Sequence, residues 1–116
     1  MSNSVIGHIE IPTTDIEASA KFYLETLGWD FKPFGKGYYL CNTHKGTTLG
    51  LRSVEKILTG DTTIFHFLVH NIQDTLAVIE NKGGKVVRTR TVIPVYGWYA
   101  LFEDNVGNTI GLYQTH

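Results

Sequence analysis

Residues 46–51 read Gly-Thr-Thr-Leu-Gly-Leu, and residues 107–112 read Gly-Asn-Thr-Ile-Gly-Leu. Two stretches so alike, far apart in one short chain, indicate that the same structural unit is written twice. Both stretches begin at a glycine and continue with β-branched and apolar residues, which is typical of a strand that follows a turn. The repeat therefore predicts two copies of a unit that ends in a strand.

Each copy also begins in the same way. Residues 5–11 alternate in polarity, which predicts a strand, and Asp15 follows as the N-cap of a helix. The same order returns in residues 63–70, with Asn71 as the cap. Glycine ends both predicted helices, at Gly28 and at Gly83-Gly84.

Three further strands follow each helix, because segments rich in aromatic and β-branched residues lie between glycines. They are predicted at 29–34, 38–42 and 47–52 in the first copy and at 85–95, 98–103 and 109–114 in the second. We expect an α+β fold in which two repeated β-α-β-β-β modules form a joint mixed sheet around a groove, with the helices outside. The single domain spans 1–116, with module one at about 1–52, a connector at 53–62 and module two at about 63–116.

Composition excludes several classes of protein. A net charge of -1 without a run of Lys or Arg argues against binding to nucleic acid or to a membrane surface. No stretch reaches the roughly 18 apolar residues that span a bilayer, and no signal peptide is evident, so we expect a cytoplasmic protein. Cys41 is the single cysteine, which excludes an intramolecular disulfide and a cysteine-based zinc cluster.

Strand alternation places three polar side chains toward the groove: His8, Glu10 and His66. Glu10 and His66 occupy equivalent positions in the two modules. A histidine beside a carboxylate can take or give a proton, so these three are the candidate catalytic residues. The alternative reading is that they satisfy one another's hydrogen bonds inside a polar groove.

The candidate ligand-binding residues are a cation and four aromatic side chains: Arg52, Tyr39, Trp98, Tyr99 and Tyr113. Aromatic side chains with a polar end can clamp a planar organic ligand, although core packing and a dimer contact are equally ordinary roles for them. The planar guanidinium of Arg52 suits a carboxylate or a phosphate, and the alternative for this residue is a solvated surface charge.

Several motifs resemble the glyoxalase/bleomycin resistance protein/dioxygenase superfamily, also called the vicinal oxygen chelate superfamily. They are His8-Ile9-Glu10-Ile11-Pro12, Lys21-Phe22-Tyr23, Leu27-Gly28-Trp29 and the closing run from Phe102 through Asp104 to Gly107-Asn108. Asn105 stands where the family usually has proline. The resemblance covers essentially the whole chain and implies paired β-α-β-β-β modules.

Metal-dependent members of that superfamily take one ligand from the first strand and one from the last strand of each module. By the resemblance, these positions are His8, Gly50, Ile64 and Gly111. Three of the four carry no side-chain donor, whereas a protein-bound divalent cation needs three or four. We therefore expect no metal and no cofactor.

The resulting expectation is a metal-free protein that binds a small organic ligand in an aromatic groove, with acid/base chemistry through His8, Glu10 or His66. Any enzymatic activity would be lyase-like or isomerase-like. The alternative is a metal-dependent lyase, isomerase or dioxygenase that uses a displaced ligand set of His8, Glu10 and His66. Exposed sheet edges and surplus aromatic surface, together with the family's habit of pairing, predict a homodimer.

Overall fold

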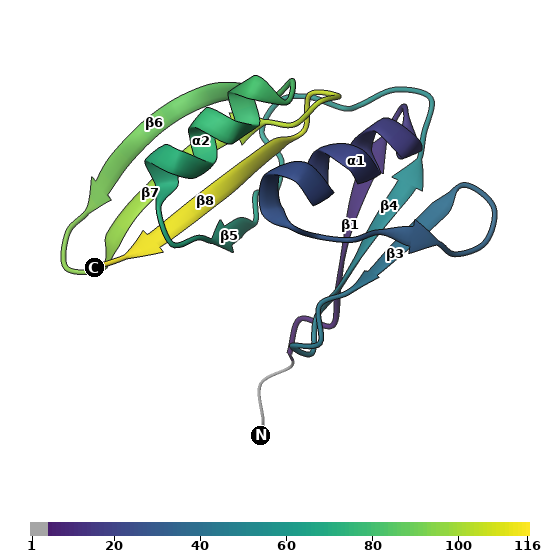
Figure 1. Cartoon of the computed structure of the whole chain (residues 1–116), viewed down its shortest axis with the longest axis horizontal. Coiled ribbons are helices and arrows are strands. Elements are labelled where there is room, and N and C mark those ends of the chain that lie inside the picture. Colours follow the sequence, from purple (N-terminus) through teal and green to yellow (C-terminus); the bar gives the residue numbers. More distant parts are fainter. Residues whose placement is uncertain (1–4) are drawn as a thin grey trace.

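The computed structural model describes residues 5–116, so the first four residues of predicted module one lie outside the described residues. The chain forms two β-α-β-β-β modules, which confirms the repeat and the α+β class (Figure 1). The helices are α1 (Ile16–Leu27) and α2 (Ile72–Asn81). The strands are β1 (His8–Thr13), β2 (Lys32–Pro33), β3 (Tyr38–Asn42), β4 (Thr48–Ser53), β5 (His66–Leu68), β6 (Lys85–Ile93), β7 (Gly97–Glu103) and β8 (Thr109–Thr115).

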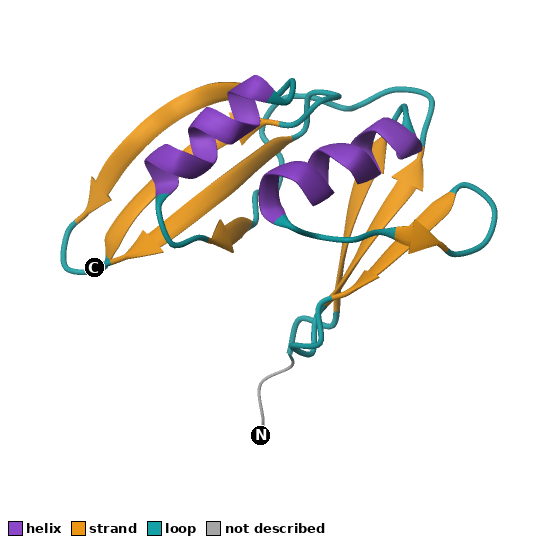
Figure 2. Cartoon of the chain, viewed as in Figure 1, coloured by secondary structure: helices purple, strands orange, loops and turns teal. Residues whose placement is uncertain are grey.

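Each module builds a four-stranded mixed sheet, in the orders β1-β4-β3-β2 and β5-β8-β7-β6. The first strand of each module pairs in parallel with the last, and the remaining pairs are antiparallel. Both helices lie on one side of the sheets (Figure 2). The mixed sheet expected to be joint is divided into two sheets, each with its own hydrogen-bond ladder, and β1 and β5 each form one edge of their sheet.

The predicted helix caps form as expected. The Asp15 carboxylate accepts a hydrogen bond from the Ala18 amide at 3.1 Å, and the Asn71 side chain accepts one from the Asp74 amide at 3.0 Å. Gly28 adopts a φ of 75°, a left-handed conformation that glycine reaches without strain, and α1 ends there. These local signals fix where each helix begins and where α1 ends.

Two predicted strands are shorter than the sequence pattern indicated. The prediction of a strand over 63–70 was wrong at both ends, because only His66–Leu68 forms a strand. The preceding residues instead line a cavity between the modules. The strand predicted over 29–34 is also shorter than expected, because only Lys32–Pro33 forms a strand.

The core lies between the sheets and the helices. Its largest fully buried side chains come from both modules and include Tyr23, Phe102, Ile11, Leu51 and Leu112. The predicted alternation is correct here, because Ile11, Leu49 and Leu51 of the first module and Phe67, Ile110 and Leu112 of the second are all buried on the helix side. In the part of the chain that the structure describes, neither helix is long and apolar enough to cross a membrane.

A buried carboxylate joins the two modules. Asp104, in the turn between β7 and β8, accepts a hydrogen bond from the Tyr23 hydroxyl of α1 at 2.7 Å. It also accepts hydrogen bonds from the Val106 amide, the Asn108 amide and the Asn108 side chain, at 3.1, 2.9 and 2.9 Å. The Asn108 side chain continues to the Pro12 carbonyl of β1 at 2.7 Å. The turn of one module is thereby tied to the helix and first strand of the other.

We expect Asp104→Ala to lower the free energy of unfolding by about 3 kcal/mol, because it leaves several buried donors without an acceptor. Urea unfolding followed by circular dichroism measures the change. Asp61→Ala is the matched control, since Asp61 is exposed in the connecting segment and its loss should cost less than about 0.5 kcal/mol. Equal stability of the two variants would show that the Asp104 network does not hold the modules together.

Candidate functional site

The inner face of the first sheet, on the side away from the helices, carries a row of polar side chains. His8 pairs with Thr48, Glu10 with Gly50 and Tyr38 with Arg52, so all six residues share this face. Both ring nitrogens of His8 have partners, Nδ1 with the Thr48 hydroxyl at 2.6 Å and Nε2 with the Tyr38 hydroxyl at 2.6 Å. In a neutral imidazole one nitrogen donates and the other accepts, so His8 links the two hydroxyls.

Gly50 makes this arrangement sterically feasible. A Cβ atom at this position would overlap the Tyr38 hydroxyl and would lie 2.9 Å from Nε2 of His8. Gly111, the equivalent residue of β8, plays the same part in the second module, where a Cβ atom would overlap the ring of His66. Each strand-interior glycine therefore clears space into which a polar ring of a neighbouring strand fits.

Glu10 and Arg52 form an ion pair next to this cluster. Nε of Arg52 donates to Oε1 of Glu10 at 2.6 Å, and both side chains are partly open to solvent. The hydrogen bond from Arg52 lowers the pKa of Glu10 below its usual value of 4.5, with a smaller contribution in the same direction from a hydrogen bond of the Tyr38 hydroxyl. The pKa of Tyr38 is raised, first by burial and then by the neighbouring Glu10. Glu10 is thus ionised and Tyr38 protonated at neutral pH.

The structure brings only part of the predicted catalytic group together. His8 and Glu10 lie on the first sheet with Tyr38 beside both, whereas His66 is exposed on the second sheet. The nearest aromatic neighbour of His66 is Tyr99, with ring centroids 6.5 Å apart. Within residues 5–116 no hydrogen bond joins His66 to either of the other two side chains.

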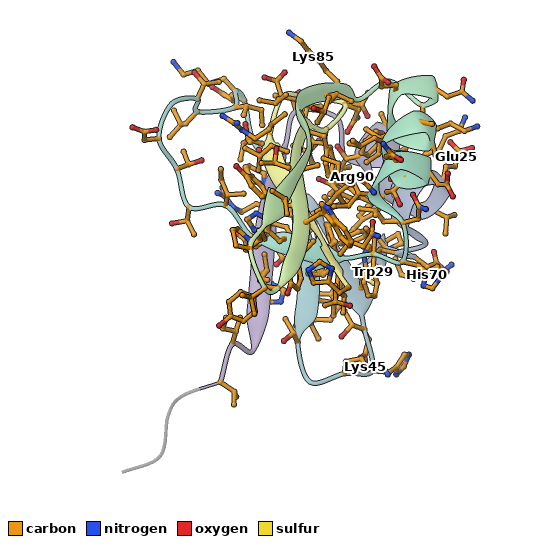
Figure 3. The ribbon with its side chains drawn as sticks, turned by 90° about the vertical axis from the view of Figure 1, so that its left-hand side faces the viewer. Glu25, Trp29, Lys45, His70, Lys85 and Arg90 are labelled. Atoms are coloured by element: carbon orange, nitrogen blue, oxygen red, sulfur yellow. The ribbon has the colours of Figure 1, made fainter. Side chains whose placement is uncertain are left out.

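The predicted ligand-binding aromatics divide between the two faces of the sheets. Tyr99 and Tyr113 pair across β7 and β8 and face inward. Tyr39 and Trp98 pack against the core on the helix side. Arg90 lies over the Trp98 ring, 5.1 Å from its centroid, and extends toward the side of α2 (Figure 3). Tyr39 and Trp98 therefore belong to the core wall, and Tyr99 and Tyr113 face the side away from the helices.

A cavity of about 540 Å³ opens where the two modules meet. Its walls come from β1, the end of β4, the turn before β8 and the connecting segment, which runs on the side of the sheets away from the helices (Figure 3). The lining includes the Glu10–Arg52 pair, with Lys56, Glu103 and Asn108 as further polar groups. This volume lies within the range of pockets that hold small organic molecules.

Comparison with known proteins agrees with this architecture. The sequence profile of the Glyoxalase/Bleomycin resistance protein/Dioxygenase superfamily matches residues 5–112. The chain belongs to this superfamily. A glyoxylase-like domain-containing protein from Didymella fabae is 28% identical over 116 residues, covering 90% of this chain and 88% of the relative.

Solved structures show the same superfamily fold. A glyoxalase/bleomycin resistance protein/dioxygenase family enzyme from Burkholderia phytofirmans PsJN superposes with a TM-score of 0.81 at 15% identity, covering 95% of this chain and 98% of that chain. TnmS3, an antibiotic binding protein from Streptomyces sp. CB03234, superposes with a TM-score of 0.72 at 22% identity, covering 100% and 99%. At these identities the likeness concerns the fold.

The residues at the superfamily's metal positions do not fit a divalent cation. The space beside Gly50 is filled by the Tyr38 hydroxyl, and the space beside Gly111 by the His66 ring. His8 directs both of its nitrogens at hydroxyl groups. Among residues 5–116 there is no group of three His, Cys, Asp or Glu side chains that could hold a metal ion.

Sequence reasoning left Tyr38 and Thr48 out of the catalytic group, although both contact His8 directly. A signal for Tyr38 was present in the pairing of β3 with β4. Leu51 is a core residue, so its partner Tyr39 must share the core face, and Tyr38 must then share the groove face with Arg52. Deciding whether Tyr38 or Tyr39 faces the groove therefore required the register between β3 and β4.

We expect Gly50→Ala to push the Tyr38 ring away from His8 and to lower the free energy of unfolding by about 1–3 kcal/mol, as overpacking does. Denaturant unfolding measures the cost. Gly7→Ala is the matched control, because a Cβ atom there meets nothing within 4 Å. In a Tyr38→Ala background the same Gly50→Ala change should cost much less. An equal cost in both backgrounds would contradict the proposed crowding.

We expect the Glu10 carboxyl to titrate below pH 4.5 and to return toward that value in Arg52→Gln, which removes the main cause of the shift. Because the folded-state pKa is depressed, the stabilisation from the pair is present above the unfolded pKa and is lost as the pH falls through the lowered one. Carbon-13 NMR of the Glu10 carboxyl measures both values. Lys32→Gln, which removes a cation paired with Asp30 elsewhere, should leave the Glu10 pKa unchanged.

Proposed function

We propose that this protein binds a small organic ligand in the groove between its modules and does so without a divalent metal. The observation that carries the proposal is the cavity of about 540 Å³, which combines apolar walls with the oriented Glu10–Arg52 pair. Pockets of this kind, mostly apolar with a few fixed polar groups, are typical of small-molecule sites. The description of TnmS3 as an antibiotic binding protein supports small-molecule binding on this fold.

The side chains of His8, Tyr38 and Glu10 can supply proton transfer. His8 can hold or release a proton at Nε2, and Tyr38 at Oη, with 2.6 Å between the two atoms. Glu10 lies close enough to Tyr38 to influence its pKa. Of these three side chains only Glu10 lines the cavity, so a ligand must extend from Glu10 along the sheet face to meet a proton donor in Tyr38 and an acceptor in His8. Such steps belong to lyase-like and isomerase-like reactions.

We also propose that the protein is a homodimer. Large apolar side chains remain exposed on the described part of the chain, among them Ile6, Phe34, Leu68, Val95 and Tyr96. Leu68 lies on the edge strand β5 and is 70% exposed. A second copy would cover such apolar surface and protect the sheet edges.

Native mass spectrometry and elemental analysis of the untagged protein test these proposals. We expect a mass of two 13.0 kDa chains, a co-purifying organic adduct, and far less than one zinc, nickel, iron or manganese per chain. The adduct should weaken in Glu10→Ala and persist in Glu55→Ala, which removes an exposed carboxylate outside the cavity lining. Close to one metal per chain, lost in His8→Ala, would instead establish the metal-dependent alternative. A lone 13.0 kDa mass would refute the dimer.

A further inference from the structure

We infer that the ligand of the groove is a small organic monocarboxylate with an apolar body, bound through the guanidinium of Arg52. This inference rests on the proposed function and names the class of ligand. It follows from three features of the cavity: the unused hydrogen-bonding capacity of Arg52, the balance of charge around it and the apolar wall beside it.

The guanidinium of Arg52 is held in one orientation, but only part of its hydrogen-bonding capacity is used. Nε donates to Glu10 at 2.6 Å, whereas neither terminal nitrogen makes a hydrogen bond within residues 5–116. The side chain is 52% exposed and lines the cavity. A guanidinium has five N–H donors in a planar fork, so this one retains the paired donors that match the two oxygens of a carboxylate.

Glu10 acts as a positioning residue for this fork. By fixing Nε it restricts the rotation of the arginine side chain, which reduces the entropy lost when a ligand binds. Because Glu10 stays ionised near neutral pH, the restraint persists there. The Glu10–Arg52 pair has no net charge. Whether the cavity prefers an anionic or a cationic ligand therefore depends on the neighbouring charged groups.

Those neighbouring groups favour a single negative charge. Glu103 lines the cavity and forms no ion pair among the described residues. Lys56 lines the cavity and has no ion pair among the described residues. Arg52 and Lys56 thus balance Glu10 and Glu103, and the lining carries no excess charge. Because no excess positive charge compensates for lost hydration, a dianionic phosphate is costly to bury here, whereas a monocarboxylate needs only the paired donors of Arg52.

The rest of the lining determines the body of the ligand. Ile9 and Phe65, which are partly buried, form the apolar part of the lining together with Leu58 of the connecting segment. Ile11 and Ile110 also border the cavity but are almost fully buried in the core. Leu58 is 76% exposed, so a bound apolar group would remove its surface from water. The combination selects a molecule with a hydrophobic or aromatic body and one carboxylate.

The test uses a panel of aromatic and branched aliphatic monocarboxylic acids, each with its matched primary amide, titrated into the full chain. Proton–nitrogen NMR shifts locate binding, and calorimetry measures the affinity. We expect acids to bind at least about tenfold more tightly than their amides, a difference of about 1.4 kcal/mol. Arg52→Gln should remove that preference, and Arg52→Lys should retain only part of it, because lysine lacks the planar fork.

Arg90→Gln is the matched control, because it removes an arginine on the helix side and should leave acid binding within about twofold. Acids and amides that bind the groove equally, or acid binding unaffected by Arg52→Gln, would overturn the carboxylate inference while leaving small-molecule binding in place. If no member of the panel shifts resonances of the cavity lining, the carboxylate inference fails, whereas the proposed function fails only if native mass spectrometry finds no organic adduct. These two failures are thus separable.

Discussion

The structure depends on one buried carboxylate. Asp104 gathers hydrogen bonds from its own turn and from the Tyr23 hydroxyl of α1, so a single group both shapes a turn and joins the two modules. A buried charge of this kind is costly unless it is fully hydrogen-bonded, and here it is. Three of its hydrogen bonds come from its own turn, and the fourth, from the Tyr23 hydroxyl, crosses to the other module.

The geometry of the groove depends on the contact between the two modules at Asp104. Asn108, which donates to Asp104, also donates to the Pro12 carbonyl at the end of β1, and both residues line the cavity. The position of β1 against the start of β8 therefore sets the width of the cavity between the sheets. Glu10 lies two residues before Pro12 on the same strand, so the ion pair with Arg52 is held in place by the same contact.

Much of this fold could be predicted because its signals are local in the sequence. Helix caps, the closing glycine of α1 and strand alternation depend on a few neighbouring residues, and the repeat supplies each signal twice. The site was harder to predict because its contacts cross strands. Which of Tyr38 and Tyr39 faces the groove depends on register, and whether His66 meets His8 depends on how two sheets are placed. Neither the strand register nor the relative placement of the sheets can be inferred from a few neighbouring residues.

The glycine at position 50 also determines what a metal site in this chain would require. A metal ligand on that strand and the Tyr38–His8 contact would occupy the same volume, so the two arrangements are mutually exclusive. Replacing Gly50 by a ligating residue would expel Tyr38 before the other ligands were in place. Any stepwise change from one arrangement to the other therefore passes through a protein that has neither a complete metal site nor the Tyr38–His8 contact.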